Sequence, residues 1–356
     1  MRISVLGVGL IGGSIGLAAR RRVGASVAGF DPDPAVGALA LECGAIDEVA
    51  PDIDAAVAGA DVVFVAAPVG VLARTVREAL AVAGPDCVVT DVGSTKRALA
   101  AVGPDERFIG GHPLAGAESA GVAHAREDLF DGATWYLTPL GSTAGVLYER
   151  LHKLLSSFGA QPTAIDADTH DRLMAWVSHM PHVLANLLVS RTSGLLRDDE
   201  QRLPAVGPSF RDATRVAGAN SSIWTDIYLS NRDALLAGVG ELQERLREVE
   251  GWLVAGDDEA VRAWIEAART DRDALLGAGL TGGPVHELRA SVPNRPGVIA
   301  EIALALGRAG VNIADMALSP SPDNSQGTVA LWVGGEGQAE RARELIAQLG
   351  FPVVAA

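Results

Sequence analysis

The sequence predicts three consecutive domains: an α/β domain with a parallel sheet, an all-helical domain and a small α+β domain. Short apolar strands alternate with helical segments up to about residue 165, and strand signals then stop until about residue 280. Strands and helices return after the turn-forming stretch Thr281–Pro284. A length of 356 residues exceeds what one ordinary hydrophobic core supports. We therefore expect domains over 1–165, 166–280 and 285–356.

The composition is that of a globular protein and excludes several classes of partner. Hydrophobic residues make up 48% of the chain and charged residues 21%. The formal net charge of -15 argues against nucleic acid or an anionic membrane, because both attract clustered Lys and Arg. Cys43 and Cys87 have no metal-ligand spacing, which favours a reducing compartment. Neither a secretion signal nor an apolar run of about 20 residues occurs, so we expect a cytoplasmic protein.

A glycine-rich turn joins the first predicted strand, Arg2–Leu6, to a helix over Ser14–Arg21. Gly7 permits the tight turn, Gly9 leaves room for a pyrophosphate, and Gly12 lets the helix pack closely on the strand. The carboxylate of Asp31, directly after the second strand, can accept hydrogen bonds from ribose hydroxyls and repel a 2′-phosphate. The pattern predicts a Rossmann-type, doubly wound sheet that binds NAD. The candidate cofactor residues are Gly7, Gly9, Leu10, Ile11, Gly12, Asp31, Ala67 and Pro68.

A histidine occurs where a later strand ends, in the stretch Phe108–Glu118. His112 stands between a glycine and Pro113, and proline disfavours a helical residue before it. Ligands of parallel sheets bind beyond the carboxyl ends of the strands, so His112 is a candidate for chemistry. A structural histidine in a turn is the alternative. Ser94 also follows a strand and either caps the next helix or reaches His112 or a substrate, whereas helix capping is the preferred interpretation of Asp91.

The middle domain begins with one long predicted helix, Asp168–Leu195. Helical spacing places His170, Ser178 and His182 on one face, with His179 turned away. Pro181 is expected to bend the helix beside His182. Three histidines on one helix can be core residues or can line a site. We reject a zinc site, because no cysteine and no His-x₃-His with a carboxylate accompany them.

A second polar cluster, 207–216, precedes a segment that begins at Trp224. An arginine can hold a carboxylate by two parallel hydrogen bonds, so Arg211 or Arg215 is a candidate for binding an acidic substrate. We interpret Arg211 as a surface residue. Helices over 234–253 and 257–270 complete a bundle whose apolar stripes are expected to pair with a second subunit, which predicts a homodimer.

The last domain follows the order βαββαβ, from a strand over Val285–Val292 to a final strand near Phe351–Val354. Its ~70 residues suffice for a marginal core only. We assign it no chemistry and expect it to bind a small molecule or a subunit.

The chain resembles the prephenate dehydrogenases of tyrosine biosynthesis over about residues 3–275, and its tail resembles an ACT amino-acid-sensing domain. Five motifs in order carry the first resemblance: Gly7–Ser14, Asp91–Ser94, Gly111–Gly116, Ser178–His182, and Thr214–Val216 followed by Trp224. In the tail, Asn294–Gly297 before a helix and Gly310–Ile313 after it are similar to the ACT ligand loop.

The resemblance implies NAD-dependent oxidative decarboxylation of prephenate to 4-hydroxyphenylpyruvate. His112 would be the base that takes the proton of the ring hydroxyl, with Ser94 orienting His112 or that hydroxyl. Arg215 would hold a substrate carboxylate. Further substrate contacts are implied for His182, Ser178, His170, Glu118 and Trp224. Tyrosine would act as a feedback effector at Asn294, Arg295, Pro296, Gly297, Asn312 and Ile313.

Three other functions stay open. Arogenate differs from prephenate at one side-chain group, so an arogenate dehydrogenase would look alike. Dehydrogenases of β-hydroxy acids with a helical second domain use a lysine base there, and no lysine follows Lys153 in this chain. A sensor that binds NAD and an amino acid without catalysis is the remaining alternative.

Overall fold

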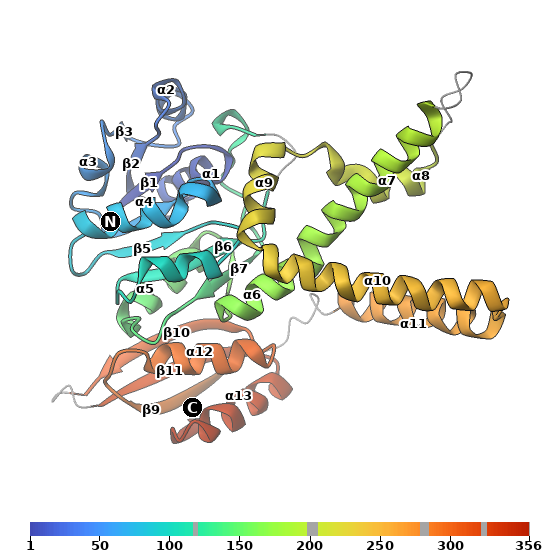
Figure 1. Cartoon of the computed structure of the whole chain (residues 1–356). Helices are drawn as coiled ribbons and strands as arrows, with labels where there is room; N and C mark the ends of the chain where they lie inside the picture. Colours follow the sequence, from blue (N-terminus) through green and yellow to red (C-terminus); the bar gives the residue numbers. More distant parts are fainter. Residues whose placement is uncertain (117–119, 198–205, 278–284, 322–325, 356) are drawn as a thin grey trace. The chain divides into compact units, whose positions relative to one another are not determined.

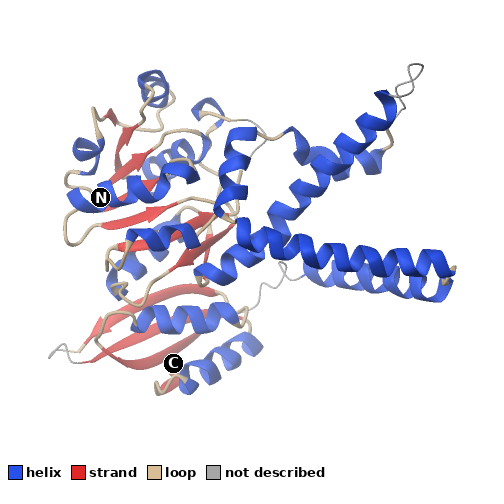
Figure 2. Cartoon of the chain, viewed as in Figure 1, coloured by secondary structure: helices blue, strands red, loops and turns tan. Residues whose placement is uncertain are grey.

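The computed structural model describes residues 1–116, 120–197, 206–277, 285–321 and 326–355. The chain divides into two compact units, Met1–His170 with Gly283–Ala356, and Asp171–Gly282. Figures 1 and 2 show the helices and strands of the two units. The stretch Thr281–Pro284 and Glu118 lie outside the described residues.

An eight-stranded sheet forms the larger part of the first unit, in the order β3-β2-β1-β4-β5-β6-β7-β8. Neighbouring strands are parallel except for β6 and β7, which are antiparallel. The expectation of an all-parallel sheet is therefore wrong at this junction. The connection contains only a short 3₁₀-helix, Val122–His124, among its described residues, so the chain returns without a helical crossover. The strands are β1 (Arg2–Leu6), β2 (Ser26–Phe30), β3 (Glu48–Val49), β4 (Val62–Val65), β5 (Val88–Asp91), β6 (Phe108–Pro113), β7 (Thr134–Thr138) and β8 (Gln161–Ala164).

Helices cover the sheet, as the apolar runs of its central strands require, because such strands bury both faces. All four residues of β4 are buried. The first helix starts at Leu10, four residues earlier than expected, because Gly9 serves as its N-cap. The helices are α1 (Leu10–Ala18, continued by a π-helix over Ala19–Val23), α2 (Pro34–Glu42), α3 (Ile53–Val57), α4 (Val69–Val82), a 3₁₀-helix (Arg97–Val102) and α5 (Gly145–Ser157).

The C-terminal part of the first unit has the predicted βαββαβ order. Its antiparallel sheet has the order β10-β11-β9-β12. This part shares one apolar core with the larger sheet, in which Ile299 of α12 faces the start of α5 at Gly145. Its elements are β9 (Val285–Pro293), α12 (Val298–Arg308), β10 (Ile313–Pro320), β11 (Gln326–Gly334), α13 (Glu336–Gln348) and β12 (Val353–Ala355).

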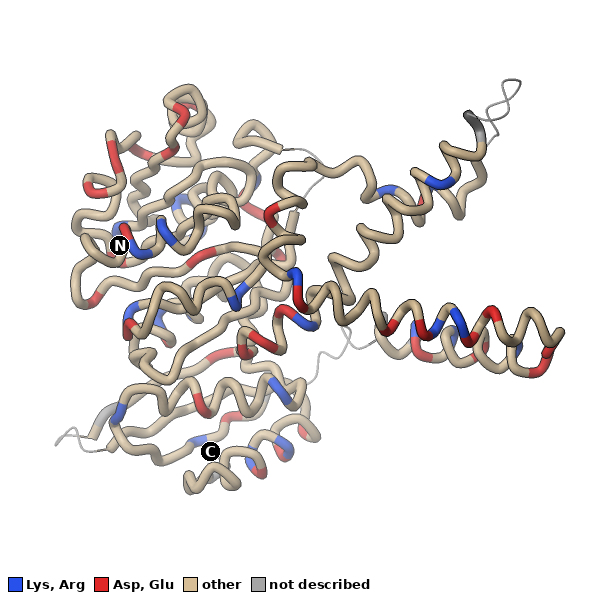
Figure 3. The backbone as a smooth tube through the Cα atoms, viewed as in Figure 1, with Lys and Arg blue, Asp and Glu red and all other residues tan. Residues whose placement is uncertain are grey.

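The second unit is helical, as predicted. The expected long helix is present, but a π-helical turn interrupts it just before Pro181, whose missing N–H breaks the regular ladder. Figure 3 shows charges of both signs interspersed along α10 and α11. Arg245 and Glu248 of α10 form a salt bridge at 2.9 Å. No helix among the described residues is long and apolar enough to span a bilayer. The elements are α6 (Ala167–Met174), whose residues up to His170 belong to the first unit, the π-helix (Ala175–His179), α7 (Met180–Arg197), α8 (Pro208–Thr214), a 3₁₀-helix (Arg215–Gly218), α9 (Ser221–Ser230), α10 (Arg232–Ala255) and α11 (Asp258–Gly277).

Candidate active site

The glycine-rich turn after β1 has the shape that a dinucleotide phosphate needs. Gly7 has a φ of 92°, and a Cβ on Gly12 would lie 1.9 Å from the carbonyl oxygen of Gly7. A Cβ on Gly9, in contrast, would meet no atom within 4 Å. Gly9 is also the N-cap of α1 and forms no side-chain cap, so the amide groups of the first turn face this open space. The turn therefore fits a pyrophosphate.

The other predicted cofactor residues follow strands at the same edge of the sheet. Asp31 follows β2, and its Oδ2 accepts a hydrogen bond of 3.0 Å from the Val8 N–H, which ties the carboxylate to the glycine turn. Ala67 and Pro68 follow β4, which neighbours β1 where the strand order reverses direction. Such a reversal is the usual site of ligand binding in an open α/β sheet.

A buried ion pair holds the backbone before His112. The side chains of Asp91 and Lys96 have no exposed surface and form a salt bridge. Asp91 Oδ1 accepts the Gly111 N–H at 3.0 Å, and Lys96 Nζ donates to the Gly111 carbonyl at 2.5 Å. The pair thus binds both polar groups of the Gly111 peptide. Asp91 was predicted to cap a helix, and this is wrong, because the 3₁₀-helix starts only at Arg97 and has Lys96 as its N-cap.

His112 lies in β6 and is 9% exposed. Its Nδ1 forms a hydrogen bond of 2.9 Å with Nε2 of His170, a fully buried residue of α6. The two rings meet at 70°, and the edge contact of Tyr136 with His170 has a centroid distance of 5.7 Å. The structure therefore places His170 against His112. Ser94 is half-buried in the loop after β5, at the same edge of the sheet, and its expected role stays a prediction.

In the second unit, His182 is held by three side chains. Its ring stacks on Trp224 at 3.7 Å, and its Nδ1 lies 2.6 Å from the Tyr228 hydroxyl and 3.2 Å from the Asn186 amide nitrogen. Burial lowers the pKa of His182 and raises the pKa of Tyr228. The Asn186 amide nitrogen also donates to the His182 carbonyl at 2.9 Å and lies 3.4 Å from Nε2 of the ring. Tyr228 and Asn186 thus fix the position of the His182 ring.

His179 is not turned away from the site face of its helix, contrary to the prediction. His179 is buried, and its ring centroid lies 6.1 Å from that of Trp224. His182 contacts the same tryptophan. Asn231 donates to Nδ1 of His179 at 3.1 Å. His179 and His182 are three positions apart, and residues at this spacing are neighbours on a helix surface, so both reach one tryptophan.

The remaining predicted substrate residues of this unit lie on its surface or partly so. Ser178 is half-buried, whereas Arg211 on α8 and Arg215 on the following 3₁₀-helix are exposed. An exposed arginine can reach a ligand, and the substrate-binding role of Arg215 stays a prediction.

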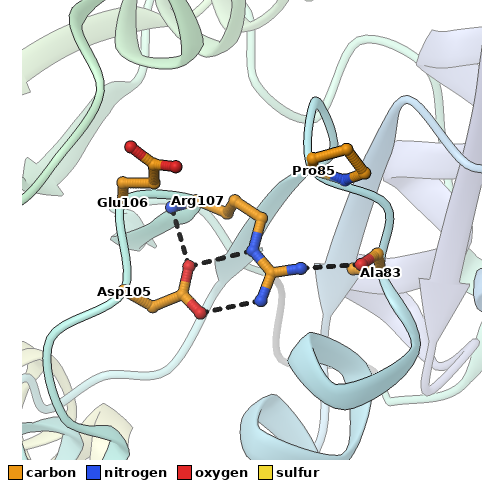
Figure 4. Close-up of a pocket in the computed structure, with 5 residues that line it drawn as sticks. All are labelled: Ala83, Pro85, Asp105, Glu106 and Arg107. Atoms are coloured by element: carbon orange, nitrogen blue, oxygen red, sulfur yellow. Dashed lines mark hydrogen bonds and ion pairs between the residues drawn. The ribbon is translucent and has the colours of Figure 1, made fainter.

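A surface depression lies at the start of β6, at the opposite end of this strand from His112 (Figure 4). It is lined by Ala83, Pro85 and 105–107. The Arg107 guanidinium contacts both carboxylate oxygens of Asp105, at 3.0 and 2.8 Å, and donates to the Ala83 carbonyl at 2.6 Å. These bonds lower the pKa of Asp105 and tie the end of α4 to β6. The polar side chains of Asp105 and Arg107 in this depression thus stabilise the fold.

The predicted effector loop lies against the larger sheet domain. The Gly297 N–H donates to the Thr143 carbonyl at 3.1 Å, and a Cβ on Gly297 would lie 2.3 Å from the Gly141 oxygen. Arg295 forms a salt bridge with Glu301 of α12. Asn312 contacts Thr163 of β8 through its side chain at 3.5 Å. Any ligand at this loop would therefore bind beside the domain that carries His112.

Three family profiles match consecutive parts of the chain. "Prephenate dehydrogenase, nucleotide-binding domain" matches residues 15–163, "Prephenate dehydrogenase, dimerization domain" residues 166–267, and "ACT domain" residues 286–351. The prephenate dehydrogenase of Bacillus subtilis (strain 168) is 32% identical over 97% of this chain and 95% of its own length. This chain belongs to the prephenate dehydrogenase family.

Solved structures of the prephenate dehydrogenase family agree with this assignment. Prephenate dehydrogenase from Aquifex aeolicus, in complex with hydroxyphenyl propionate and NAD+, has a TM-score of 0.69 and 26% identity, and covers 77% of this chain and 98% of its own. Arogenate dehydrogenase from Synechocystis has a TM-score of 0.68 and 28% identity, and covers 77% of this chain and 100% of its own. The predicted family and the predicted fold classes of the three domains are confirmed.

Sequence reasoning missed several contacts of this prephenate dehydrogenase family member. Lys96 was not singled out at all, although a lysine close to an aspartate after a buried strand is a signal for a buried pair. Tyr228 was passed over, although it follows Trp224 by four positions and so shares its helix face.

Proposed function

We propose that this protein catalyses the NAD-dependent oxidative decarboxylation of prephenate to 4-hydroxyphenylpyruvate. The observation that carries the proposal is the placement of His112 and the glycine turn. Both occur at the carboxyl edge of one sheet, with His112 held at Nδ1 by a second histidine. Membership of the prephenate dehydrogenase family supports the choice of substrate class.

In the proposed reaction, each residue acts on a distinct part of the substrate. NAD, when bound, supplies the hydride acceptor for the carbon that carries the ring hydroxyl. His112 takes the proton of this hydroxyl, since a neutral imidazole accepts a proton near pH 7. Arg215 holds a carboxylate, and His182 contacts the substrate's other end. Carbon dioxide then leaves as the ring becomes aromatic.

Arg215→Ala is expected to weaken prephenate binding by roughly 2–5 kcal/mol if the arginine–carboxylate pair is desolvated in the complex. The loss should appear in KM more than in kcat, because the carboxylate is held in the ground state as well. Steady-state kinetics on Arg215→Ala and Arg211→Ala measure this. A raised KM in the Arg211 variant alone would pass the role to Arg211.

We also propose that the chain acts as a homodimer through its helical unit. The family's dimerization domain profile covers most of this unit. Large apolar side chains are exposed on its helices, which is the pattern of a surface that a second copy covers. They include Leu229, Leu236, Leu253, Val254, Ile265 and Leu275.

The proposed substrate is tested by assaying prephenate and arogenate side by side with NAD. NADH formation with prephenate at a kcat/KM well above that with arogenate is the expected result. A preference for arogenate would instead identify the enzyme as the arogenate dehydrogenase that the resemblance leaves open. No NADH with either substrate, from protein that binds NAD, would favour the non-catalytic sensor.

The ACT domain is proposed to bind tyrosine and to lower the activity. Support comes from its contacts with the rest of the first unit, which carries His112. Arg308, at the end of α12, forms a salt bridge with Asp166 at 3.2 Å. Asp166 accepts the N–H of Thr169 at 2.9 Å in the first turn of α6, the helix that carries His170. A change at the loop before α12 can thus reach the residue that contacts His112.

Tyrosine should lower NADH formation by the full chain, and Arg308→Ala should weaken this inhibition while keeping most of the basal rate. The physical reason is that the variant removes a contact between α12 and the start of α6. Arg343→Ala, which loses only a surface pair on α13, is the matched control. Tyrosine inhibition curves for the parent, Arg308→Ala and Arg343→Ala measure this difference. Indifference of the full chain to tyrosine would exclude it as the effector.

A further inference from the structure

His170 approaches His112 on the side of its Nδ1 atom. The two nitrogens, Nδ1 of His112 and Nε2 of His170, are 2.9 Å apart. His170 has no exposed surface, and His112 is 9% exposed. A hydrogen bond at this depth has few competing water molecules, so it restricts the ring of His112 strongly.

His170 is itself held in place at its backbone and at its ring. Asp166 anchors the first turn of α6, because its carbonyl accepts the His170 N–H at 2.9 Å and its carboxylate accepts the Thr169 N–H. Tyr136 packs against the His170 ring at an angle of 85° and is also the cross-strand neighbour of His112. The ring contact therefore does not depend on a loop.

A neutral imidazole carries one N–H and one lone pair, so a bond at one nitrogen determines the chemistry of the other. If Nδ1 of His112 donates to His170, the lone pair of His112 lies on Nε2. If Nδ1 accepts instead, Nε2 carries the proton of the neutral ring and has no lone pair with which to accept another. The proposed reaction requires an acceptor on the nitrogen that is not engaged by His170.

We propose that His170 is a positioning residue: it accepts the hydrogen bond of His112 Nδ1–H and so keeps the lone pair of His112 on Nε2. The inference rests on the proposed function, in which His112 takes the hydroxyl proton. The proton moves from the substrate oxygen to Nε2, and no other bond of the ring changes. His112 then carries a positive charge, and its Nδ1–H bond to His170 becomes charge-assisted and stronger.

Two substitutions separate positioning from mere packing. His170→Phe keeps a ring against Tyr136 but cannot accept a hydrogen bond, and His170→Gln places an amide near the position of Nε2 and can accept one. We expect His170→Phe to lower kcat about 10–100-fold, the size of a lost hydrogen bond to a charged group. KM and NAD affinity should stay close to those of the parent, and His170→Gln should recover most of kcat. His124→Phe, at an exposed histidine of the same domain, is the control.

The tautomer of His112 can be read without any turnover. The chain has seven histidines, so nitrogen NMR of histidine-labelled protein can assign the His112 ring as the signal lost in His112→Asn. The expected result is a proton on Nδ1 in the parent and in His170→Gln, and loss of that preference in His170→Phe. A proton on Nε2 in the parent, or parental kcat in His170→Phe, would overturn the inference. Failure of the parent to oxidise prephenate would instead refute the proposed function, and the NMR result would still decide the role of His170.

Discussion

Replacing His112 with asparagine is expected to lower kcat for prephenate by about 10²–10⁴-fold, because asparagine cannot accept the hydroxyl proton. The dissociation constant for NAD should not change, since the glycine turn belongs to other strands of the sheet. Steady-state kinetics and a binding titration measure the two quantities on one preparation. A contribution of this size is typical of a single general base.

The matched control for this variant is His124→Asn, because His124 is exposed on the same domain. It should retain parental kinetics. Near-parental turnover in His112→Asn would remove His112 from the role of base.

Replacing Lys96 with methionine is expected to destabilise the first unit by about 3–5 kcal/mol, because it leaves the buried carboxylate of Asp91 without its counter-charge. The same variant should lower kcat, because Lys96 also binds the carbonyl of Gly111, the residue before His112. Urea unfolding followed by circular dichroism measures the stability, and the kinetic assay measures the consequence for His112.

Two comparisons make this result specific to the buried pair. The double variant Asp91→Asn with Lys96→Met should lose less stability than the two single variants added together, since it removes both charges. Lys153→Met loses an i,i+4 pair with Glu149 on α5 in which the lysine side chain is 48% exposed, and it should unfold much like the parent. Parental stability of Lys96→Met would contradict the account of the ion pair.

Local patterns predicted those parts of the fold and site that short-range chemistry determines. The glycine turn after β1, the acid after β2 and the βαββαβ order of the tail each follow from residues close together in the sequence. The position of His112 at a strand end follows from Gly111 and Pro113 in the same way.

Contacts between distant segments were not predictable from these patterns. His170 follows His112 by 58 positions, and only the packing of α6 brings the two rings together. The antiparallel pairing of β6 and β7 goes with a connection that forms only a short 3₁₀-helix among its described residues and no crossover helix. The side of the helix on which His179 lies was also misjudged, although its spacing of three positions from His182 makes the two residues neighbours on the helix surface.

The measurement that tests the central claim most directly is the product balance of the full chain with prephenate and NAD. We predict that NADH and carbon dioxide form in equal amounts, with one 4-hydroxyphenylpyruvate for each prephenate consumed. Protein that binds NAD but forms neither NADH nor carbon dioxide from prephenate would contradict the claim.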